Sequence, residues 1–231
     1  MEKLKNLLRS IPRWGYATGV AYIALSYAMY RMGNYLSIVT GSAAHAHEVK
    51  IPVIDDMIPL VPVFVIPYIL SYVFWIMGPI AVSQTRKRNF VNYIFGLTMA
   101  YVIGFLFFWI SPTYMDRASE GVLSVAAQPG LTHRLLGFIY AADGNRYGFN
   151  LFPSYHCLIS IYCWLGVRNQ PEISKGFQAY SLIMALLICM STVLTKQHYI
   201  IDVVGGVGIS LLCYILMNKL DPGSRLQKYM R

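Results

Sequence analysis

The sequence predicts an all-α polytopic membrane protein with six transmembrane helices in one bundle. Of its 231 residues, 56% are hydrophobic and only 13% are charged, which leaves too little polar surface for a soluble domain of this size. The apolar residues form runs that are much longer than a strand, and a bilayer span requires about 20 such residues. We therefore expect one membrane-embedded domain over residues 1–231, and no internal repeat is found.

Six apolar runs define the predicted spans. They lie at residues 15–39, 57–81, 91–111, 153–167, 177–195 and 199–217. The second span is rich in proline, and the fourth is short. The basic lead before the first span is followed by an apolar run too long for a signal-peptide core, so we expect this span to stay uncleaved.

Short basic clusters between the runs predict how the spans are oriented. Lys and Arg collect in cytoplasmic loops beside anionic headgroups, so the net charge of +9 requires no nucleic acid partner. We expect both termini in the cytoplasm and the loop at residues 112–152 outside. The cytoplasmic side would carry thirteen of the 19 basic residues: Lys3, Lys5, Arg9, Arg13, Arg86, Lys87, Arg88, Arg168, Lys175, Lys219, Arg225, Lys228 and Arg231.

Two further patterns concern packing. Aromatic residues near the span ends, among them Tyr72 and Trp75, are expected to lie in the interfacial belt of the membrane. The sequence GGVG at residues 205–208 predicts close approach of a neighbouring helix.

The stretch TKQHYIID, residues 195–202, places polar groups where charge is costly. His198 and Asp202 are four residues apart and would share one helix face. A carboxylate bonded to one ring nitrogen fixes the tautomer and makes the other nitrogen a better nucleophile or base. A snorkelling interfacial histidine and a metal pair are alternatives at this spacing, but no further zinc ligands present themselves. We expect no metal and no cofactor.

A second polar group lies in NLFPSYHCLIS, residues 150–160. Pro153 before an apolar run marks a helix start, so Ser154 would lie in the first turn, where free N–H groups favour an anion. His156 lies in the same turn and on the same predicted side as His198. One histidine would attack phosphorus while the other protonates the leaving oxygen.

Two cations on that side are candidates for binding phosphate. Arg117 follows the third span, and its planar guanidinium suits a phosphate group. Lys196 lies two residues before His198 and would add positive charge in the transition state.

These motifs resemble the type-2 phosphatidic acid phosphatase superfamily of membrane lipid phosphatases. The family signature Pro-Ser-Gly-His is similar to PSYH at residues 153–156, with Tyr155 in place of glycine. The signature Ser-Arg, five residues, His, three residues, Asp is similar to the segment that ends in His198 and Asp202, with Thr192 in place of arginine. The resemblance covers essentially the whole chain.

The resemblance implies roles for individual residues. His198 would be the nucleophile that forms a phospho-histidine, Asp202 would orient it, and His156 would be the general acid. Arg117 would stand for the arginine of the first signature, although Ile110 occupies its lysine position and Ala118 its proline position. We expect four substrate-binding residues: Arg117, Lys196, Ser154 and Tyr155.

Where the sequence differs from these signatures, it is similar to a branch of the superfamily that includes sphingomyelin and inositol phosphorylceramide synthases. Members of this branch hand a phosphoryl headgroup to a lipid alcohol instead of water. The similar pieces are PTYMDR at residues 112–117 and the His-Tyr-x-x-Asp sequence that starts at His198.

Three functions remain open from the sequence. The first, which the sequence favours, is a lipid phosphatase that hydrolyses phosphatidic acid, phosphatidylglycerol phosphate or a polyprenyl (pyro)phosphate at the outer membrane face. The second is a lipid headgroup phosphotransferase. The third is a non-enzymatic transporter, which is disfavoured because the polar residues gather at one membrane face. The expected partners are a phosphorylated lipid and the bilayer, and the small size favours a bacterial plasma membrane; the oligomeric state is not predicted.

Overall fold

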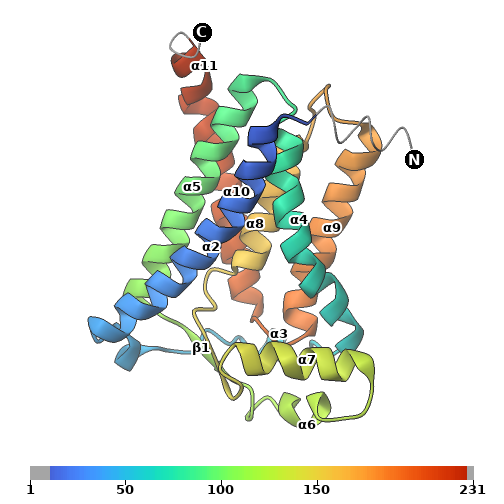
Figure 1. The fold of residues 1–231 in the computed structure, drawn as a ribbon. Helices are drawn as coiled ribbons and strands as arrows, with labels where there is room; N and C mark the ends of the chain where they lie inside the picture. The colour runs from blue at the N-terminus through green and yellow to red at the C-terminus, as the bar shows by residue number, and fades with distance from the viewer. Residues whose placement is uncertain (1–10, 228–231) are drawn as a thin grey trace.

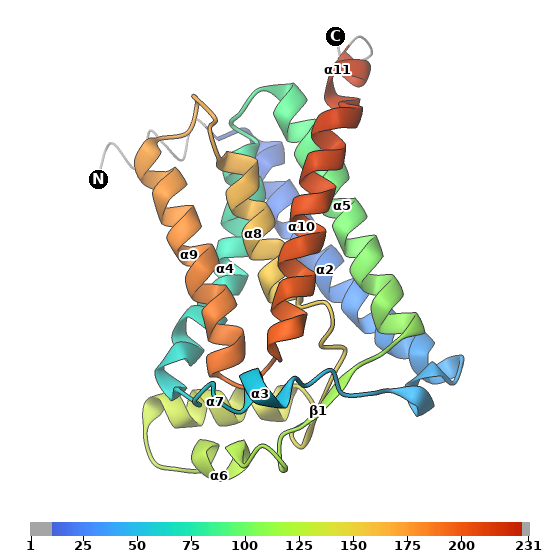
Figure 2. The same cartoon turned by 180° about the vertical axis from the view of Figure 1, so that it is seen from behind.

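Six helices run between the two ends of a bundle within residues 11–227, the part of the chain that the computed structural model describes (Figure 1). They are α2 (Arg13–Val39), α4 (Val65–Val82), α5 (Lys87–Ile110), α8 (Tyr155–Val167), α9 (Lys175–Leu194) and α10 (Ile200–Leu220). Successive helices of this set point in opposite directions (Figure 2). The protein is mostly helical, and each of these helices overlaps one of the six apolar runs.

Four helices of the described part are long and apolar enough to cross a membrane. They are α5, α9, α10, and α4 together with the preceding 3-10 turn η2 (Pro62–Phe64). Helix α8 has only 13 residues, and α2, although 27 residues long, is less apolar than these four. The chain is therefore a membrane protein with four candidate spans, and length and composition do not establish the other two of the six predicted spans.

Proline decides where the second helix of the bundle begins. The second predicted span was placed too early, because η2 starts with Pro62 and α4 only at Val65. Proline lacks an N–H and is favoured at the first helical position, so it starts a helix more readily than it continues one. Between residues 46 and 61 the only helical segment is the single turn α3 (Pro52–Asp55).

Helix α8 occupies the centre of the bundle. It packs against α4, α5, α9 and α10, and every one of its residues except Trp164 is buried. The close approach of α10 requires glycine, since a Cβ on Gly206 would lie 2.5 Å from the carbonyl oxygen of Ser154. The prediction of close helix packing at GGVG is confirmed at this position. The short central helix thus presents its first turn to groups from all its neighbours.

A layer of short elements covers one end of the bundle, called here the α7 end (Figure 1). Beside α3 it contains η1 (Ser42–His45), α6 (Val122–Ala126), α7 (Leu131–Ala142) and an antiparallel pair, β1 (Tyr114–Asp116) with β2 (Tyr147–Phe149). The predicted loop at residues 112–152 is therefore partly ordered into helices and strands.

The opposite end, called here the α11 end, carries α11 (Pro222–Gln227) (Figure 2). Arg88 of α5 holds this helix in place through a salt bridge to Asp221, whose carboxylate also accepts a hydrogen bond from Asn92. Many of the predicted cytoplasmic basic residues belong to helix ends or turns on this side, namely Arg13, Arg86, Lys87, Arg88, Arg168, Lys175, Lys219 and Arg225. Lys3, Lys5, Arg9, Lys228 and Arg231 lie outside the described residues.

Candidate active site

A cavity of about 790 Å³ lies between α2, α4, α7 and the start of α8. Its walls are mainly aromatic and aliphatic, and its volume is in the range of sites that bind a small molecule. The rim includes Tyr27, Tyr72 and Phe138, which are 66%, 44% and 70% exposed. The polar wall at the other side includes His156, Gln197 and His198.

His198 and Asp202 form the predicted pair. Nδ1 of His198 donates a hydrogen bond to Oδ2 of Asp202 across 3.4 Å, a long contact of the kind that often tightens when substrate binds. The two residues do not share a helix as predicted, because His198 lies in the turn before α10 and Asp202 lies in the first turn of that helix. The Asp202 carboxylate also accepts from the backbone N–H of Tyr199 at 2.9 Å, which fixes it at the helix start.

His156 lies in the first turn of α8 and faces His198, with 6.1 Å between the ring centroids. Its Nε2 is buried and has no hydrogen-bond partner among the described residues. The ring stacks on Tyr68 at 4.1 Å and contacts Trp75 at 4.9 Å between centroids. The structure therefore brings the two predicted histidines together at one cavity wall, with an unpaired nitrogen between aromatic rings.

Ser154 and Tyr155 start α8 and make contacts within the protein. The Ser154 hydroxyl accepts from the backbone N–H of Cys157, and its own N–H donates to the Asp202 carbonyl at 3.0 Å. Tyr155 contributes its ring to the cavity wall, but its hydroxyl donates to the Tyr101 carbonyl at 2.7 Å. Both residues thus position the first turn of α8, where His156 lies.

Arg117 is fully buried, and the protein itself compensates its charge. Nη2 donates to the Asp143 carboxylate at 2.6 Å and to Oε1 of Gln197 at 2.9 Å. Nη1 donates to the carbonyls of Asp143 and Asn145, and the guanidinium lies over the Tyr140 ring. Arg117 is not among the cavity-lining residues, so the structure does not bring its guanidinium to the histidines.

Lys196 also points away from the cavity. Its ammonium group donates to the backbone carbonyl of Asp55 at 2.7 Å, and its backbone is left-handed with φ of 48°. The Asp55 carboxylate accepts from the N–H of Ile200, the first residue of α10. Lys196 and Asp55 together tie the turn of His198 to the segment around α3.

Helix α7 is held against the same turn. The Tyr140 hydroxyl donates to the Thr195 carbonyl at 2.8 Å, and Leu136 packs beside it in a small core with Val65. Burial raises the pKa of Tyr140, so this hydroxyl stays protonated and remains a donor. The turn that carries His198 is therefore enclosed by α7, α9 and α10.

Gln197 and the aromatic residues around His156 were not among the predicted site residues. Trp75 is buried and donates from Nε1 to the Ser160 hydroxyl at 2.9 Å, so its assignment to the interfacial belt was wrong. Tyr68, Tyr72 and Trp75 recur at the spacing of one helix face, a pattern that indicates a common packing surface. Gln197 gave a weaker signal, since it is a neutral residue between Lys196 and His198.

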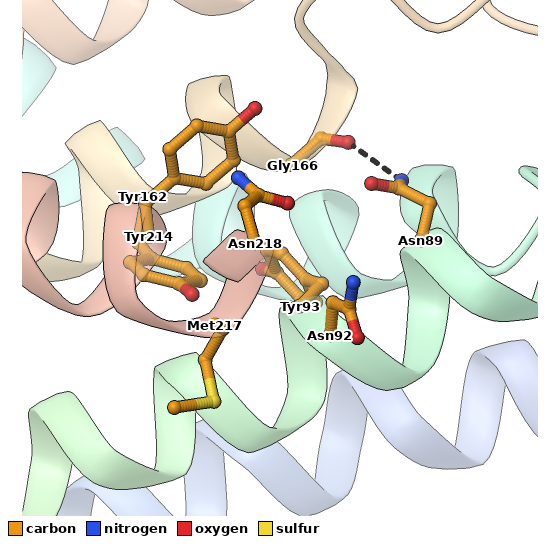
Figure 3. A pocket seen from close by; sticks show the side chains of 8 residues that line it. All are labelled: Asn89, Asn92, Tyr93, Tyr162, Gly166, Tyr214, Met217 and Asn218. Atoms are coloured by element: carbon orange, nitrogen blue, oxygen red, sulfur yellow. Dashed lines mark hydrogen bonds between the residues drawn. The ribbon is translucent and has the colours of Figure 1, made fainter. Parts of the chain in front are cut away.

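A second hollow, at the α11 end, is too small to be a site. It has a volume of about 10 Å³, which is at the lower limit for one water molecule, and it lies beside Asn89, Asn92 and Tyr162 (Figure 3). Asn89 there donates to the Gly166 carbonyl, which helps to join α5 to the end of α8. No group of three or more His, Cys, Asp or Glu side chains placed to hold a metal ion is found within residues 11–227.

Comparisons with known proteins identify the family of this chain. The PAP2 superfamily matches residues 55–216, a stretch from α3 to α10 that includes both histidines and Asp202, and the chain belongs to this superfamily. The predicted superfamily is thereby confirmed, and the protein is a PAP2 enzyme, either a phosphatase or a lipid phosphotransferase.

A curated relative comes from one branch of such enzymes. An alignment of 204 residues shows 25% identity to the catalytic subunit of inositol phosphorylceramide synthase from Schizosaccharomyces pombe, and it covers 81% of this chain and 44% of that protein. The chain thus matches less than half the length of this relative. No solved structure matches the chain significantly.

Proposed function

We propose that this protein is a lipid phosphotransferase that moves a phosphoryl headgroup from one membrane lipid to a lipid alcohol through a phospho-histidine on His198. The observation that carries the proposal is the pairing of His198 and His156, with 6.1 Å between ring centroids and Asp202 bonded to Nδ1 of His198. A single phosphoryl group between the rings would contact both.

The first half of the reaction uses the two histidines in different roles. Asp202 accepts a hydrogen bond from Nδ1–H of His198, which fixes the tautomer whose Nε2 lone pair is free to attack phosphorus. The bond from phosphorus to the lipid alcohol breaks, and the departing oxygen takes a proton from His156. In the second half the acceptor hydroxyl gives its proton to His156 and attacks phosphorus, and His198 is released.

The charge of the cavity favours a phosphodiester donor over a phosphomonoester. Among the described cavity-lining residues none is Lys or Arg, and the one carboxylate, Asp143, is paired with Arg117. A phosphomonoester brings a charge of about −1.5 to −2 at neutral pH, and a buried charge without a partner is costly. A diester carries one negative charge, and its cleavage leaves the headgroup on His198 for transfer. The name of the S. pombe relative agrees with transfer.

Hydrolysis, as in a lipid phosphatase, is the second candidate. The Asp143 side chain is 29% exposed, so water reaches the polar part of the cavity and is able to act as the acceptor. Phosphatidic acid, phosphatidylglycerol phosphate and polyprenyl (pyro)phosphates are the substrates to test for this reaction.

The membrane arrangement is also part of the proposal. All six bundle helices would lie across the bilayer, with the short α8 shielded from lipid by its neighbours, and the chain would form one membrane domain over residues 1–231. The basic α11 end would face the cytoplasm, and the α7 end would face outward, in a bacterial plasma membrane. The lipid would reach the histidines sideways, between α2 and α4, past the exposed rim of Tyr27, Tyr72 and Phe138.

A lipid panel with phosphorus label tests the proposal. Purified protein would receive labelled phosphatidic acid or labelled glycerophospholipid diesters, each with diacylglycerol or ceramide as acceptor. Thin-layer chromatography would separate a new phospholipid, which we expect, from the soluble products of hydrolysis. These are inorganic phosphate from phosphatidic acid and a headgroup phosphate from a diester. His156→Ala should slow turnover by roughly 10²- to 10⁴-fold and trap labelled enzyme on His198. Equal turnover by wild type and His198→Ala would refute both functions.

A further inference from the structure

We propose that the side-chain amide of Gln197 binds the phosphoryl group directly, and that Arg117 acts through Gln197 as a positioning residue. The inference rests on the proposed function, because it names a further substrate contact in the same site. It also identifies a neutral donor in a cavity wall that has no cation.

Gln197 is held in a fixed relation to the nucleophile. The backbone N–H groups of Gln197 and His198 both donate to the carbonyl of Thr192, at 2.9 and 3.1 Å. The Gln197 side chain is almost fully buried and lies on the cavity wall with the His198 and His156 rings. A phosphoryl group bound to His198 would therefore lie next to the Gln197 amide.

Arg117 determines which way the Gln197 amide faces. A guanidinium has only donors, so the Gln197 atom 2.9 Å from Nη2 of Arg117 has to be the carbonyl oxygen. The choice between the two amide orientations thus follows from the chemistry of the guanidinium. The NH₂ group of Gln197 is consequently directed away from Arg117.

This NH₂ group lacks a partner. Nε2 of Gln197 is buried and makes no hydrogen bond within the described part of the chain, and the same is true of Nε2 of His156. Buried donors are nearly always paired, since an unpaired one loses its hydration without compensation. Asn150 Nδ2 is likewise buried and unpaired among the described residues, so three unpaired nitrogens lie on the wall of this one cavity. They indicate a shared acceptor, and non-bridging phosphoryl oxygens provide it. The amide adds a donor without adding charge, as a diester substrate requires.

Arg117 makes the amide rigid. The guanidinium is fixed by the Asp143 carboxylate at 2.6 Å, by two backbone carbonyls and by the Tyr140 ring. A donor that is already oriented costs no reorganisation when charge develops on phosphorus. Since Arg117 does not line the cavity, it acts on the reaction through partners that do, and of these Gln197 is the one adjacent to His198.

Gln197→Glu separates the two roles that this residue could have. Glutamate keeps an oxygen that accepts from Arg117, but it replaces the NH₂ donor with an anionic oxygen that repels phosphate. With the labelled lipid that wild type uses, we expect kcat/KM to fall by about 10²- to 10³-fold, mostly in kcat, with Tm unchanged or higher. Gln128→Glu is the matched control, because Gln128 is exposed in the layer at the α7 end and makes the same change of charge outside the cavity.

A double-mutant comparison tests the positioning role. Arg117→Lys alone should lower kcat more than it changes KM. In the Gln197→Glu background it should lower kcat no further, since both changes remove the same contact, that of the Gln197 NH₂ group with the phosphoryl group. If turnover by Gln197→Glu lies within about threefold of the Gln128→Glu control, the inference is overturned, because the loss of one transition-state donor lowers turnover by much more than that. If His198→Ala also keeps wild-type turnover, the proposed function itself fails, so the two failures are distinguishable.

Discussion

Lys196 donates its ammonium hydrogen to the backbone carbonyl of Asp55, 2.7 Å away, although the two residues are 141 positions apart in the chain. The Asp55 carboxylate in turn accepts hydrogen bonds from the N–H of Ile51 and the N–H of Ile200. One lysine and one aspartate thus join the segment before α4 to the start of α10. The turn that carries Gln197 and His198 lies between these contacts, so its geometry depends on them.

Removal of the Lys196 contact should therefore act on stability. We expect Lys196→Ala to lower the free energy of unfolding by about 1.5–3 kcal/mol, the range for a hydrogen bond to a charged group, and to leave KM for the lipid unchanged. Lys196→Gly should be less harmful than an alanine at this left-handed position, because glycine adopts φ of 48° without strain. Thermal unfolding in detergent and lipid titration measure the two effects. A raised KM at unchanged Tm would instead identify Lys196 as a phosphate ligand.

Asp202→Asn tests how the nucleophile is oriented. Asparagine still accepts from the Tyr199 N–H, so Tm should change little, but it does not hold Nδ1 of His198 as a carboxylate does. We expect turnover to fall by roughly 10²- to 10⁴-fold, as for other groups that fix a catalytic imidazole. The yield of labelled enzyme in the His156→Ala background should fall as well. Unimpaired labelling would show that Asp202 only caps α10.

Gly206→Ala tests the contact between α8 and α10. The new Cβ would meet the Ser154 carbonyl and the Leu158 N–H, which belong to backbone and do not yield. We expect a loss of about 1–3 kcal/mol in stability together with lower activity, because the first turn of α8 carries His156. Gly208→Ala is the control, since nothing lies within 4 Å of its Cβ, and it should be neutral or stabilising by about 0.5–1 kcal/mol. Equal Tm values for the two variants would contradict this packing argument.

The strand pair at the α7 end should show a pH dependence. Hydrogen bonds from Arg146 lower the pKa of the Asp116 carboxyl below its usual value. A lowered folded-state pKa stabilises the protein above the unfolded-state pKa of about 3.9, and this contribution disappears as the pH falls through the folded-state value. We expect Arg146→Gln to lower Tm slightly at pH 7, and the difference from wild type to shrink below about pH 4.

Arg134→Gln is the control for this pH dependence. Arg134 lies on α7, is exposed, and makes no ion pair within residues 11–227. The same loss of charge there should give no difference in Tm that depends on pH between 3 and 7. If the difference in Tm from wild type shrank in both variants as the pH fell, the cause would be the net charge and not the ion pair of Arg146 with Asp116.

The helices and the two histidines could be predicted because their signals are local. Long apolar runs specify helices in a membrane. His156, His198 and Asp202 lie in short motifs, whose spacing is recognisable without knowledge of distant contacts. The start of α4 was misplaced because Pro59 and Pro62 lie in an apolar run, where hydropathy does not reveal a break.

The state of the cations could not be predicted in this way. Arg117 and Lys196 look like free phosphate ligands in the sequence, but Asp143 and Asp55, which neutralise or bind them, come from remote segments. Only the folded chain shows that both charges are used internally. The same long-range contact, from Arg117 to Gln197, reveals the neutral residue that the motif left unnoticed.

The brevity of α8 has a consequence for the lipid. Thirteen residues of helix cover about 20 Å, whereas the hydrocarbon core of a bilayer is about 30 Å thick. If the far end of α8 is level with its neighbours, the reacting phosphorus sits roughly 10 Å beneath the opposite headgroup plane. A substrate lipid would then have to move below the level of the surrounding headgroups, or the bilayer would have to become thinner around the protein. Turnover in vesicles should accordingly rise as the surrounding acyl chains are shortened.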